Sequence, residues 1–330
     1  RSPRPPAPPP PRPPRRAASS ATPPAARAPR HCATTPLTSR RLTPKTLPKV
    51  VLFGDPAKGP VAEAIEDFTR FLQGKAEVIA TCYIEKCTAD VLGESDFAIV
   101  FGGDGSIISA ARDLCQTQVP VIGVNLGKLG YLAEFSVGEL KDFFDNVVAG
   151  KAPIERRMLL GCWVSESGHA GREKFRSPAV NEVFITSGPP FRMIELKIIV
   201  DGEHVATSVS DGLIVSTPTG STAYNLSAGG PILAASMEAM VITPICPHSL
   251  SFRPIVIDAG SRVEICCMRV NEGTTVSIDG QVSRLLAADD VVRVAREASS
   301  FLVVNNPMRT PWQTLASKLG WAGRPNYERP

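Results

Sequence analysis

The sequence predicts an α/β fold, in which an N-terminal Rossmann-like domain with a parallel sheet precedes an antiparallel, sandwich-like β-rich domain. Three observations predict it. Apolar runs of strand length alternate with helical patterns over residues 48–150. Short runs separated by Gly, Pro, Asn and Asp dominate residues 151–305. Helical spacing returns at 312–321, and we expect the segment 306–330 to pack back on the first domain. Strand–helix alternation is typical of a parallel sheet, and closely spaced short strands are typical of an antiparallel one.

The first domain takes its elements from the alternation of apolar runs and helical patterns. Strands are expected over residues 49–54, 77–82, 97–101 and 119–124, and helices over 61–74, 107–114 and 137–149. In a parallel sheet of this kind, ligands bind at the carboxyl ends of the strands. We therefore expect the functional residues of this domain in the turns that follow its strands.

The second domain consists of short β-rich runs. Strands are expected over residues 158–164, 179–186, 194–200, 212–216, 253–257, 262–266, 275–278, 291–294 and 300–304. Long helical patterns are scarce between them, which favours an antiparallel domain over a second α/β unit.

The turn Gly102-Gly103-Asp104-Gly105-Ser106 follows a buried strand and precedes a helix. Three glycines let backbone N–H groups and the positive helix end face an anion without intervening side chains. A carboxylate there repels a phosphate unless it binds Mg²⁺ or takes a proton from an attacking hydroxyl. Asp104 therefore favours a kinase. The alternative is an ordinary strand–helix turn in which Asp104 caps the helix.

Length and charge limit the classes of protein. The 330 residues are 43% hydrophobic, which suffices for two domains with cores. No apolar run reaches the roughly 18 residues that a membrane span needs, so no membrane partner is expected. The net charge is +4, but 11 of the 36 basic residues lie in residues 1–50, which hold no acidic ones. The remaining 25 face 32 acidic residues, a balance of −7 that argues against a nucleic-acid partner.

Residues 1–47 are expected to be a disordered Pro/Arg-rich extension, because their composition cannot form a core. The Arg-rich, acid-free composition is typical of an organellar transit peptide, whereas so many prolines do not suit the amphipathic helix of such a peptide. An import signal and a mere extension remain alternatives. We expect a cytoplasmic protein, or an organellar one if residues 1–47 are a transit peptide.

The eight cysteines and four histidines show no metal-ligand spacing. No C-x-x-C pair occurs, so we expect no structural metal and no disulfide framework. The cysteines are interpreted as small apolar side chains in a reducing compartment.

A second polar stretch runs from Asp211 to Pro231 and contains small hydroxylated residues, glycines and one aromatic, Tyr224. Its N–H groups and hydroxyls suit a diphosphate or ribose, and Tyr224 suits a flat ring. The alternative is a turn-rich loop between strands. Asn181-Glu182 could contact a purine edge and a ribose hydroxyl, and Asp279-Gly280-Gln281 closes a predicted hairpin; each by itself also fits local turn chemistry.

Together these stretches resemble the NAD kinase family. The resemblance is carried by Gly102–Gly105, Gly123–Leu132, Asn181–Val183, Asp211–Pro231 and Ser277–Gln281. They occur in the family's order, and the resemblance extends over residues 48 to about 321. The GGDG turn is shared with lipid kinases and 6-phosphofructokinases, whereas the loop from Thr217 to Pro231 is specific to the family.

The resemblance implies an ATP-dependent NAD kinase that phosphorylates the 2′-hydroxyl of the adenosine ribose of NAD and gives NADP. It implies that Asp104 is the proton acceptor. It implies nucleotide contacts by Asp104, Gly105, Asn181, Glu182, Arg192, Asp211, Thr222, Ala223, Tyr224, Asn225, Leu226, Ser227 and Gln281. It further implies that Mg²⁺ enters with ATP, and that the protein is a homodimer or homotetramer in which a neighbour completes parts of the site.

Three alternatives stay open at this point. A 6-phosphofructokinase shares the turn and the length, but its Thr-Ile-Asp-Asn-Asp-type segment is absent. A lipid kinase of the diacylglycerol type would need an apolar acyl site in place of the hydroxyl-rich residues 217–227. A nucleotide sensor without turnover would bind NAD and form no NADP.

Overall fold

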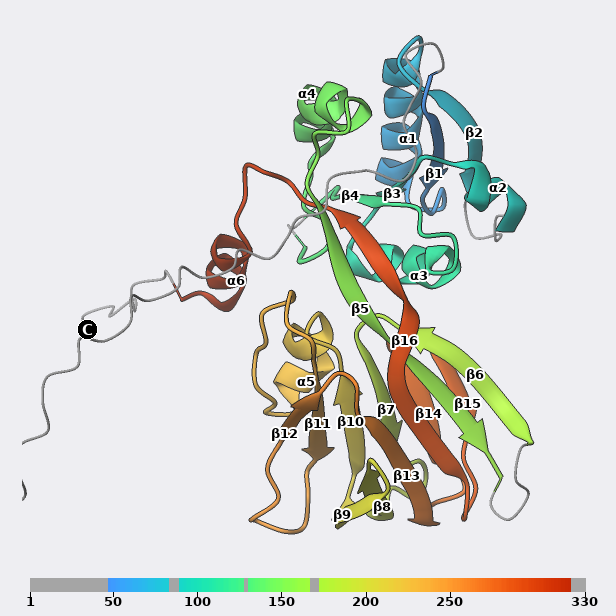
Figure 1. Cartoon of the computed structure of the whole chain (residues 1–330), viewed down its shortest axis with the longest axis vertical. Coiled ribbons are helices and arrows are strands. Elements are labelled where there is room, and N and C mark those ends of the chain that lie inside the picture. Colours follow the sequence, from blue (N-terminus) through green and yellow to red (C-terminus); the bar gives the residue numbers. More distant parts are fainter. Residues whose placement is uncertain (1–46, 83–88, 128–129, 167–171, 322–330) are drawn as a thin grey trace, which may run out of the picture. The chain divides into compact units, whose positions relative to one another are not determined.

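The computed structural model describes residues 47–82, 89–127, 130–166 and 172–321 (Figure 1). The predicted extension, apart from residue 47, lies outside the described residues, as do Lys128 and Leu129 of a second glycine-rich connection, Gly123–Leu132. No helix in the described ranges is long and apolar enough to cross a bilayer.

A parallel sheet forms the N-terminal part. Its strands are β1 (Lys49–Phe53), β2 (Glu77–Cys82), β3 (Phe97–Phe101) and β4 (Val121–Val124), in the order β2-β1-β3-β4. All three neighbouring pairs are parallel. β3 and β4 are buried along their whole length, because helices cover both faces of the sheet. The predicted parallel sheet is confirmed.

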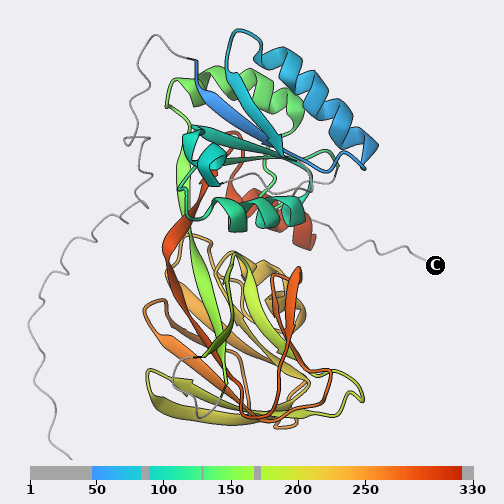
Figure 2. The same ribbon diagram turned by 90° about the vertical axis from the view of Figure 1, so that its right-hand side faces the viewer.

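The helices of this part lie on opposite faces of the sheet (Figure 2). They are α1 (Gly59–Leu72), α2 (Ala89–Glu94), α3 (Asp104–Leu114) and α4 (Val137–Val148). Phe68 of α1 and Phe144 of α4 share one core with alternate residues of β1 and β3. Ile107 of α3 belongs to the core on the other face. α3 thus starts where β3 ends, at the carboxyl edge of the sheet.

Two long strands, β5 (Ile154–Ser165) and β16 (Val291–Val304), pair antiparallel and run from the α/β part into the β-rich part (Figure 1). The C-terminal end of β16 also pairs with β4 at Val303 and Val121, so the parallel sheet continues into an antiparallel one. The strands that complete this ten-stranded sheet are β6 (Glu173–Ala179), β8 (Ile194–Val200), β9 (Glu203–Ser210) and β13 (Arg262–Arg269).

A second, six-stranded sheet is antiparallel throughout and packs against the first over one apolar core. Its order is β12 (Ile255–Asp258), β11 (Ala239–Ile245), β10 (Gly212–Ser216), β7 (Glu182–Thr186), β14 (Thr275–Ile278) and β15 (Val282–Leu285). A 3₁₀ turn, η1 (Gly220–Thr222), and a short helix, α5 (Tyr224–Ser227), follow β10. The predicted antiparallel β-rich part is confirmed.

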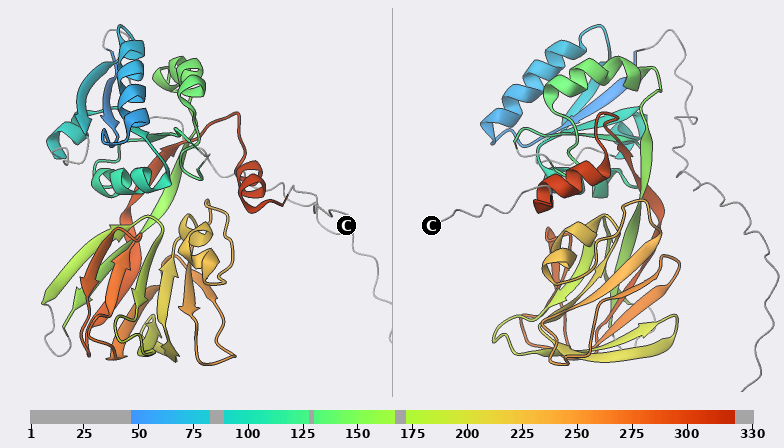
Figure 3. Two further views of the ribbon diagram at one scale, coloured as in Figure 1. Left: turned by 180° about the vertical axis from the view of Figure 1, so that it is seen from behind. Right: turned by 90° about the vertical axis from the view of Figure 1, so that its left-hand side faces the viewer.

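The C-terminal helix α6 (Pro311–Leu319) begins with a capping box between Thr310 and Gln313 and ends at Gly320 in the left-handed conformation. The segment before it is tied to the α/β part, because Arg309 pairs with Glu139 at 2.6 Å and the Asn306 N–H donates to Glu134. Figure 3 shows α6 between the α/β part and the loop that carries α5.

Several predicted elements need correction. The run expected as one strand over 179–186 is two strands, β6 and β7, separated by a turn at Val180 and Asn181. The two runs expected at 291–294 and 300–304 are the single strand β16. The helix α2, most of β6 and the strands β9 and β11 were not predicted, and β15 was predicted only as the second strand of the hairpin closed by Asp279-Gly280-Gln281.

The cysteines follow the expectation in part. Cys115, Cys162 and Cys267 are free and buried, as small apolar side chains should be. Cys82, however, is disulfide-bonded, so the expectation of thiols throughout is wrong at this position.

Candidate active site

The GGDG turn has the geometry that its glycines predict. Gly102 has φ +145°, which side chains rarely adopt, and a Cβ there would lie 2.6 Å from Ser106 Oγ. The Gly102 N–H donates to the carbonyl of Val124, which fixes the turn to the neighbouring strand β4. Gly103 is the N-cap of α3, and Asp104 is its first residue. The turn therefore places Asp104 at the positive end of a helix and at the carboxyl edge of the sheet.

The Asp104 carboxylate is held by backbone N–H groups of the glycine-rich connection. Its Oδ2 accepts from Tyr131 at 2.8 Å, and its Oδ1 accepts from Leu132 at 2.9 Å and Ala133 at 3.1 Å. A Cβ on Gly130 would lie 2.0 Å from Oδ1, so only glycine allows this approach. Asp104 thus joins the GGDG turn to the glycine-rich connection Gly123–Leu132.

A cation from α6 faces the same carboxylate. Lys318 Nζ lies 3.6 Å from Asp104 Oδ2 and 4.3 Å from the centroid of the Tyr131 ring. Both partners of the ion pair are about one quarter exposed, so the pair is open to solvent and to a ligand. Lys318 was not among the residues predicted from the sequence, in which it is marked only as a basic residue in the last turn of a helix expected to return to this domain.

A buried ion pair connects α3 to the β-rich part. Arg112 Nη1 lies 3.2 Å from Asp279 Oδ2, and Arg112 Nη2 donates to Gln281 Oε1 at 2.6 Å. Gln281 Nε2 in turn donates to the carbonyl of Gly105 at 2.9 Å. The Asp279 side chain is fully buried and that of Arg112 nearly so. Contacts between residues about 170 positions apart in the chain thereby fix the hairpin of β14 and β15 to the helix that carries Asp104.

Asp279 also holds the turn at Asn181 and Glu182. Its Oδ1 accepts the N–H groups of Val180, Asn181 and Glu182 at 2.7 to 3.1 Å. Burial raises the pKa of the Asp279 carboxyl, while these N–H groups and Arg112 oppose the rise. The predicted residues Asn181, Glu182, Gln281 and Gly105 are therefore brought together around one buried carboxylate.

Glu182 is a buried acid with a free oxygen. The residue is 4% exposed, and its Oε2 has no hydrogen-bond partner among the described residues. Burial, together with the negative charge of Asp279, raises the pKa of Glu182 to about 8. The carboxyl is therefore largely protonated at neutral pH, when it can both donate and accept a hydrogen bond.

The raised pKa of Glu182 makes the contribution of this residue to stability fall as the pH rises. The folded protein holds this proton up to about pH 8. The unfolded chain releases it near its ordinary value of about 4.5. Since the folded state binds more protons between these limits, this residue's contribution to the unfolding free energy decreases as pH rises from about 4.5 to 8.

Gln cannot ionise, so we expect the Tm difference, Glu182→Gln minus wild type, to increase between pH 5 and pH 9. Glu173→Gln, at an exposed position on β6, serves as the control and should show a constant difference. A constant difference for Glu182→Gln as well would contradict the raised pKa.

The loop after β10 is stabilised from within. The Asn225 side chain is fully buried, donates to the carbonyls of Ser221 and Pro231, and accepts from Thr243 Oγ1 at 2.6 Å. A Cβ on Gly230 would lie 2.1 Å from Asn225 Oδ1. Asn225, a predicted nucleotide contact, therefore has its polar atoms engaged within the protein and shapes the loop.

The other loop residues are available to a ligand to different degrees. Thr222, Ala223 and Leu226 are partly buried, and Ser227 is exposed. Tyr224 packs edge-on against Phe184 of β7, with ring centroids 5.1 Å apart. Burial raises the pKa of the Tyr224 hydroxyl, with smaller contributions from the charges of Cys246, Asp211 and Glu182.

Two predicted contacts lie away from Asp104. Asp211 lies at one end of the pairing between β7 and β10, where its carbonyl accepts the N–H of Ser187. Glu182 lies at the other end, opposite Ser216. Five strand residues span about 17 Å. Arg192 is exposed in the segment before β8, where its carbonyl accepts from Asn271. No hydrogen bond or ion pair in the described ranges connects Arg192 to another predicted contact.

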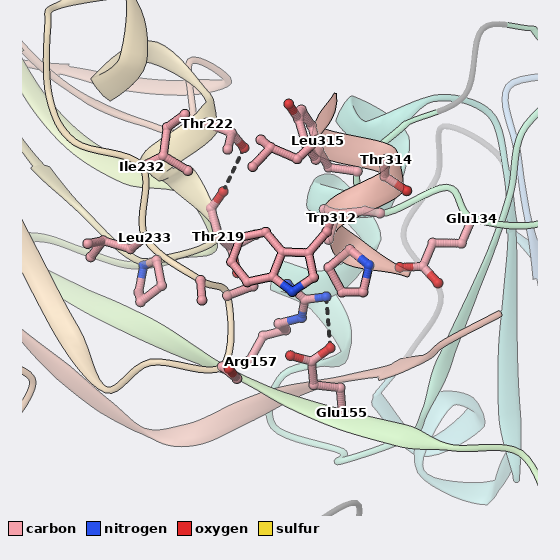
Figure 4. Close-up of a pocket in the computed structure, with 17 residues that line it drawn as sticks. Glu134, Glu155, Arg157, Thr219, Thr222, Ile232, Leu233, Trp312, Thr314 and Leu315 are labelled. Atoms are coloured by element: carbon pink, nitrogen blue, oxygen red, sulfur yellow. Dashed lines mark hydrogen bonds and ion pairs between the residues drawn. The ribbon is translucent and has the colours of Figure 1, made fainter. Parts of the chain in front are cut away.

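A cavity of about 160 Å³ lies between α6, the start of β5 and the loop after β10 (Figure 4). Tyr131 and Leu132, whose N–H groups hold Asp104, line it together with Thr219 and Thr222. The segment that holds Asp104 and the hydroxyl-bearing loop therefore border one cavity. The sequence did not point to Arg157 or Trp312, which also line it, because neither belongs to a local motif.

Comparison with known proteins matches both parts of the fold. The family model of the ATP-NAD kinase N-terminal domain matches residues 60–152, and that of the C-terminal domain matches residues 180–306. An NAD kinase of Rhodopirellula baltica is 40% identical over 278 residues, covering 84% of this chain and 88% of its own. An NAD kinase of Chromohalobacter salexigens is 43% identical over 235 residues, covering 71% and 79%.

Solved structures agree with these relatives. The yeast NADH kinase in complex with NADH has a TM-score of 0.75 at 28% identity, with 85% of this chain and 90% of that chain covered. An Archaeoglobus fulgidus NAD kinase in complex with ATP shares the fold, with a TM-score of 0.64 at 24% identity and coverage of 82% and 98%. Because both family models match and a relative is 40% identical over most of both chains, this chain belongs to the ATP-NAD kinase family.

Proposed function

We propose that this NAD kinase transfers the γ-phosphoryl group of ATP to the 2′-hydroxyl of the adenosine ribose of NAD and forms NADP. The observation that carries the proposal is the juxtaposition around Asp104: Tyr131 and Leu132, whose N–H groups hold its carboxylate, line one cavity together with Thr219 and Thr222 of the hydroxyl-bearing loop. The names of the relatives support the reaction, since they are NAD kinases.

In this proposal Asp104 takes the proton of the attacking hydroxyl. A ribose hydroxyl is scarcely ionised at neutral pH, so a carboxylate placed to accept its proton during the attack assists the transfer. Three N–H groups fix the carboxylate in position, and Lys318 is the nearest cation to it among the described ion pairs. Lys318 is also placed to meet the negative charge of the transferred group.

The acceptor nucleotide would bind between Asp104 and the turn at Asn181 and Glu182. The unpaired Oε2 of Glu182 needs a partner, and a ribose hydroxyl supplies one as donor or acceptor. Asn181 would contact the adenine edge, and Gly105, Thr222, Ala223, Tyr224, Leu226, Ser227 and Gln281 would complete the contacts.

Mg²⁺ would enter with ATP. No three His, Cys, Asp or Glu side chains in the described parts of the chain lie close enough to hold a metal ion. Both oxygens of Asp104 already accept N–H groups. This donor set fits an ion held mainly by phosphates and water, which is how Mg²⁺ is commonly bound to nucleotides. The ion would offset the charge of the transferred group.

Asp211 and Arg192 would serve the site of a neighbouring copy in a homodimer or homotetramer. Support comes from their position, since both lie at the end of the β-rich part that is remote from Asp104. In a symmetric assembly, such a surface can complete the neighbour's site.

The test is NADP formation by the purified full chain with NAD, ATP and Mg²⁺. We expect NADP to accumulate in proportion to enzyme and time. NAD binding without NADP formation would instead indicate a nucleotide sensor. Repeating the assay with NADH and with polyphosphate would define acceptor and donor.

A further inference from the structure

The cavity under α6 has the features of a site for a flat, uncharged ring. The Trp312 side chain lies across it in Figure 4, although the residue is 66% exposed and would pack more fully against a ligand. Apolar atoms of Ile232, Leu233 and Leu315 form much of the lining. A cavity of about 150 Å³ can hold benzene, so about 160 Å³ suits one ring system and not a complete dinucleotide.

Two buried polar groups on the cavity wall lack partners. Arg157 is 5% exposed and Thr219 is 9% exposed. Neither Arg157 Nε nor Thr219 Oγ1 has a hydrogen-bond partner within the described ranges. An unmade hydrogen bond in a buried site is costly, which indicates that a ligand supplies the missing partners. The Nε–H of Arg157 requires an acceptor.

The charges on the wall select against an anion. Arg157 Nη2 is paired with Glu155 at 2.9 Å, and Glu134 adds a second carboxyl, whose pKa is raised by burial. A phosphate would meet two carboxyls and only one cation. An uncharged base with ring-nitrogen acceptors and an exocyclic amine, such as adenine, matches both the donors and the carboxyls.

The cavity is connected to the reaction centre through α6. Trp312 and Lys318 are six residues apart on this helix, about 9 Å along its axis. Lys318 faces Asp104 and lies over the ring of Tyr131, which also lines the cavity, so the phosphates of a nucleotide whose base lies under Trp312 would be within reach of Lys318. Among the predicted NAD contacts only Thr222 lines the cavity; Asn181, Glu182 and Tyr224 do not.

We propose that this cavity binds the purine ring of the phosphoryl donor ATP, stacked on Trp312, with Arg157 and Thr219 bonding to its edge. The proposal rests on the proposed NAD kinase reaction. It separates the donor base, under α6, from the acceptor nucleotide, at Asn181 and Glu182.

The test compares Trp312→Ala with Trp321→Ala, because Trp321 is equally exposed, follows the same helix and does not line the cavity. Loss of stacking should raise the KM for ATP about tenfold, while the KM for NAD stays within about twofold. Trp321→Ala should change neither. Inhibition by tripolyphosphate, which has no base, should be the same in both variants.

Thr219→Val replaces the hydroxyl with a methyl group of similar size and gives a second measurement. It should weaken ATP binding about fivefold and leave the folded structure nearly unchanged. If Trp312→Ala raises the KM for NAD and not that for ATP, the purine is that of the acceptor and the proposal is overturned. Unchanged constants, or equal rises in both, overturn it as well. Calorimetry measures the affinity of each variant for ATP in the absence of NAD, even if the wild type forms no NADP. Failure of the proposed reaction and failure of the proposed subsite are therefore distinguishable.

Discussion

Replacing Asp104 with asparagine should lower kcat for NADP formation by about 10²- to 10⁴-fold, because the variant has no group to accept the proton of the attacking hydroxyl. The side chain keeps its size, so we expect the Kd for NAD to stay within a few-fold. The measurement is single-turnover NADP formation together with NAD binding by calorimetry. Asp142→Asn, an exposed position on α4, makes the same chemical change away from the site and should keep wild-type activity.

The structure adds a stability effect to this prediction. Both oxygens of Asp104 accept N–H groups, and the amide nitrogen of asparagine would face one of these donors. Loss of one acceptor costs about 1–3 kcal/mol, so a Tm decrease of a few degrees should accompany the loss of rate. A variant that retains more than about one tenth of the activity would rule out Asp104 as the base and leave it the role of holding the turn.

The local features of the site could be predicted from sequence. The three glycines around Asp104 indicated a strand-to-helix turn because such backbone needs glycine, and Gly102 at φ +145° has that conformation. The long polar loop indicated a nucleotide site because it is longer and richer in hydroxyl groups than a turn between two strands requires. Each of these signals lies within a few consecutive residues.

Contacts between distant segments could not be predicted in this way. Lys318 reaches Asp104, and Arg112 reaches Asp279, only because the fold brings their elements together. Hydrophobic periodicity indicates which face of α6 is buried, but not which carboxylate lies opposite a given lysine. The buried position of Asp279, which holds three N–H groups, likewise gave no signal beyond a hairpin turn.

The errors in the strands also have physical causes. The segment at Glu297–Ser299 interrupts an apolar run and was interpreted as a boundary, yet β16 continues through it with a register shift between Arg296 and Ser300. β11 was not predicted, and its Pro244 argues against an inner strand. The pairing of β11 with β12 ends at Ile242, so at Pro244 the strand β11 pairs only with β10. The proline, which has no N–H group, is tolerated at this edge position.

Breaking the ion pair between Arg112 and Asp279 should be the most destabilising single change at a charged contact of the site. Removing one partner of a buried pair leaves the other charge uncompensated and costs about 3–5 kcal/mol. We expect Arg112→Met to lower Tm by about 6–12 °C. Arg296→Met breaks an exposed pair with Glu238 at 2.6 Å and, as the matched control, should cost less than about 1 kcal/mol.

A double-mutant cycle separates this pair from its surroundings. Asp279→Asn removes the charge and keeps an oxygen for the N–H groups of Val180, Asn181 and Glu182. The double variant with Arg112→Met should lose about 1–3 kcal/mol less than the sum of the single variants, as measured by urea unfolding. Because Arg112 also holds Gln281, and through it Gly105, its loss should loosen Asp104 relative to Glu182 and reduce kcat/KM for NAD by up to about 100-fold. Additive stabilities with unchanged kinetics would mean that the two parts of the site are aligned by the long strands β5 and β16 alone.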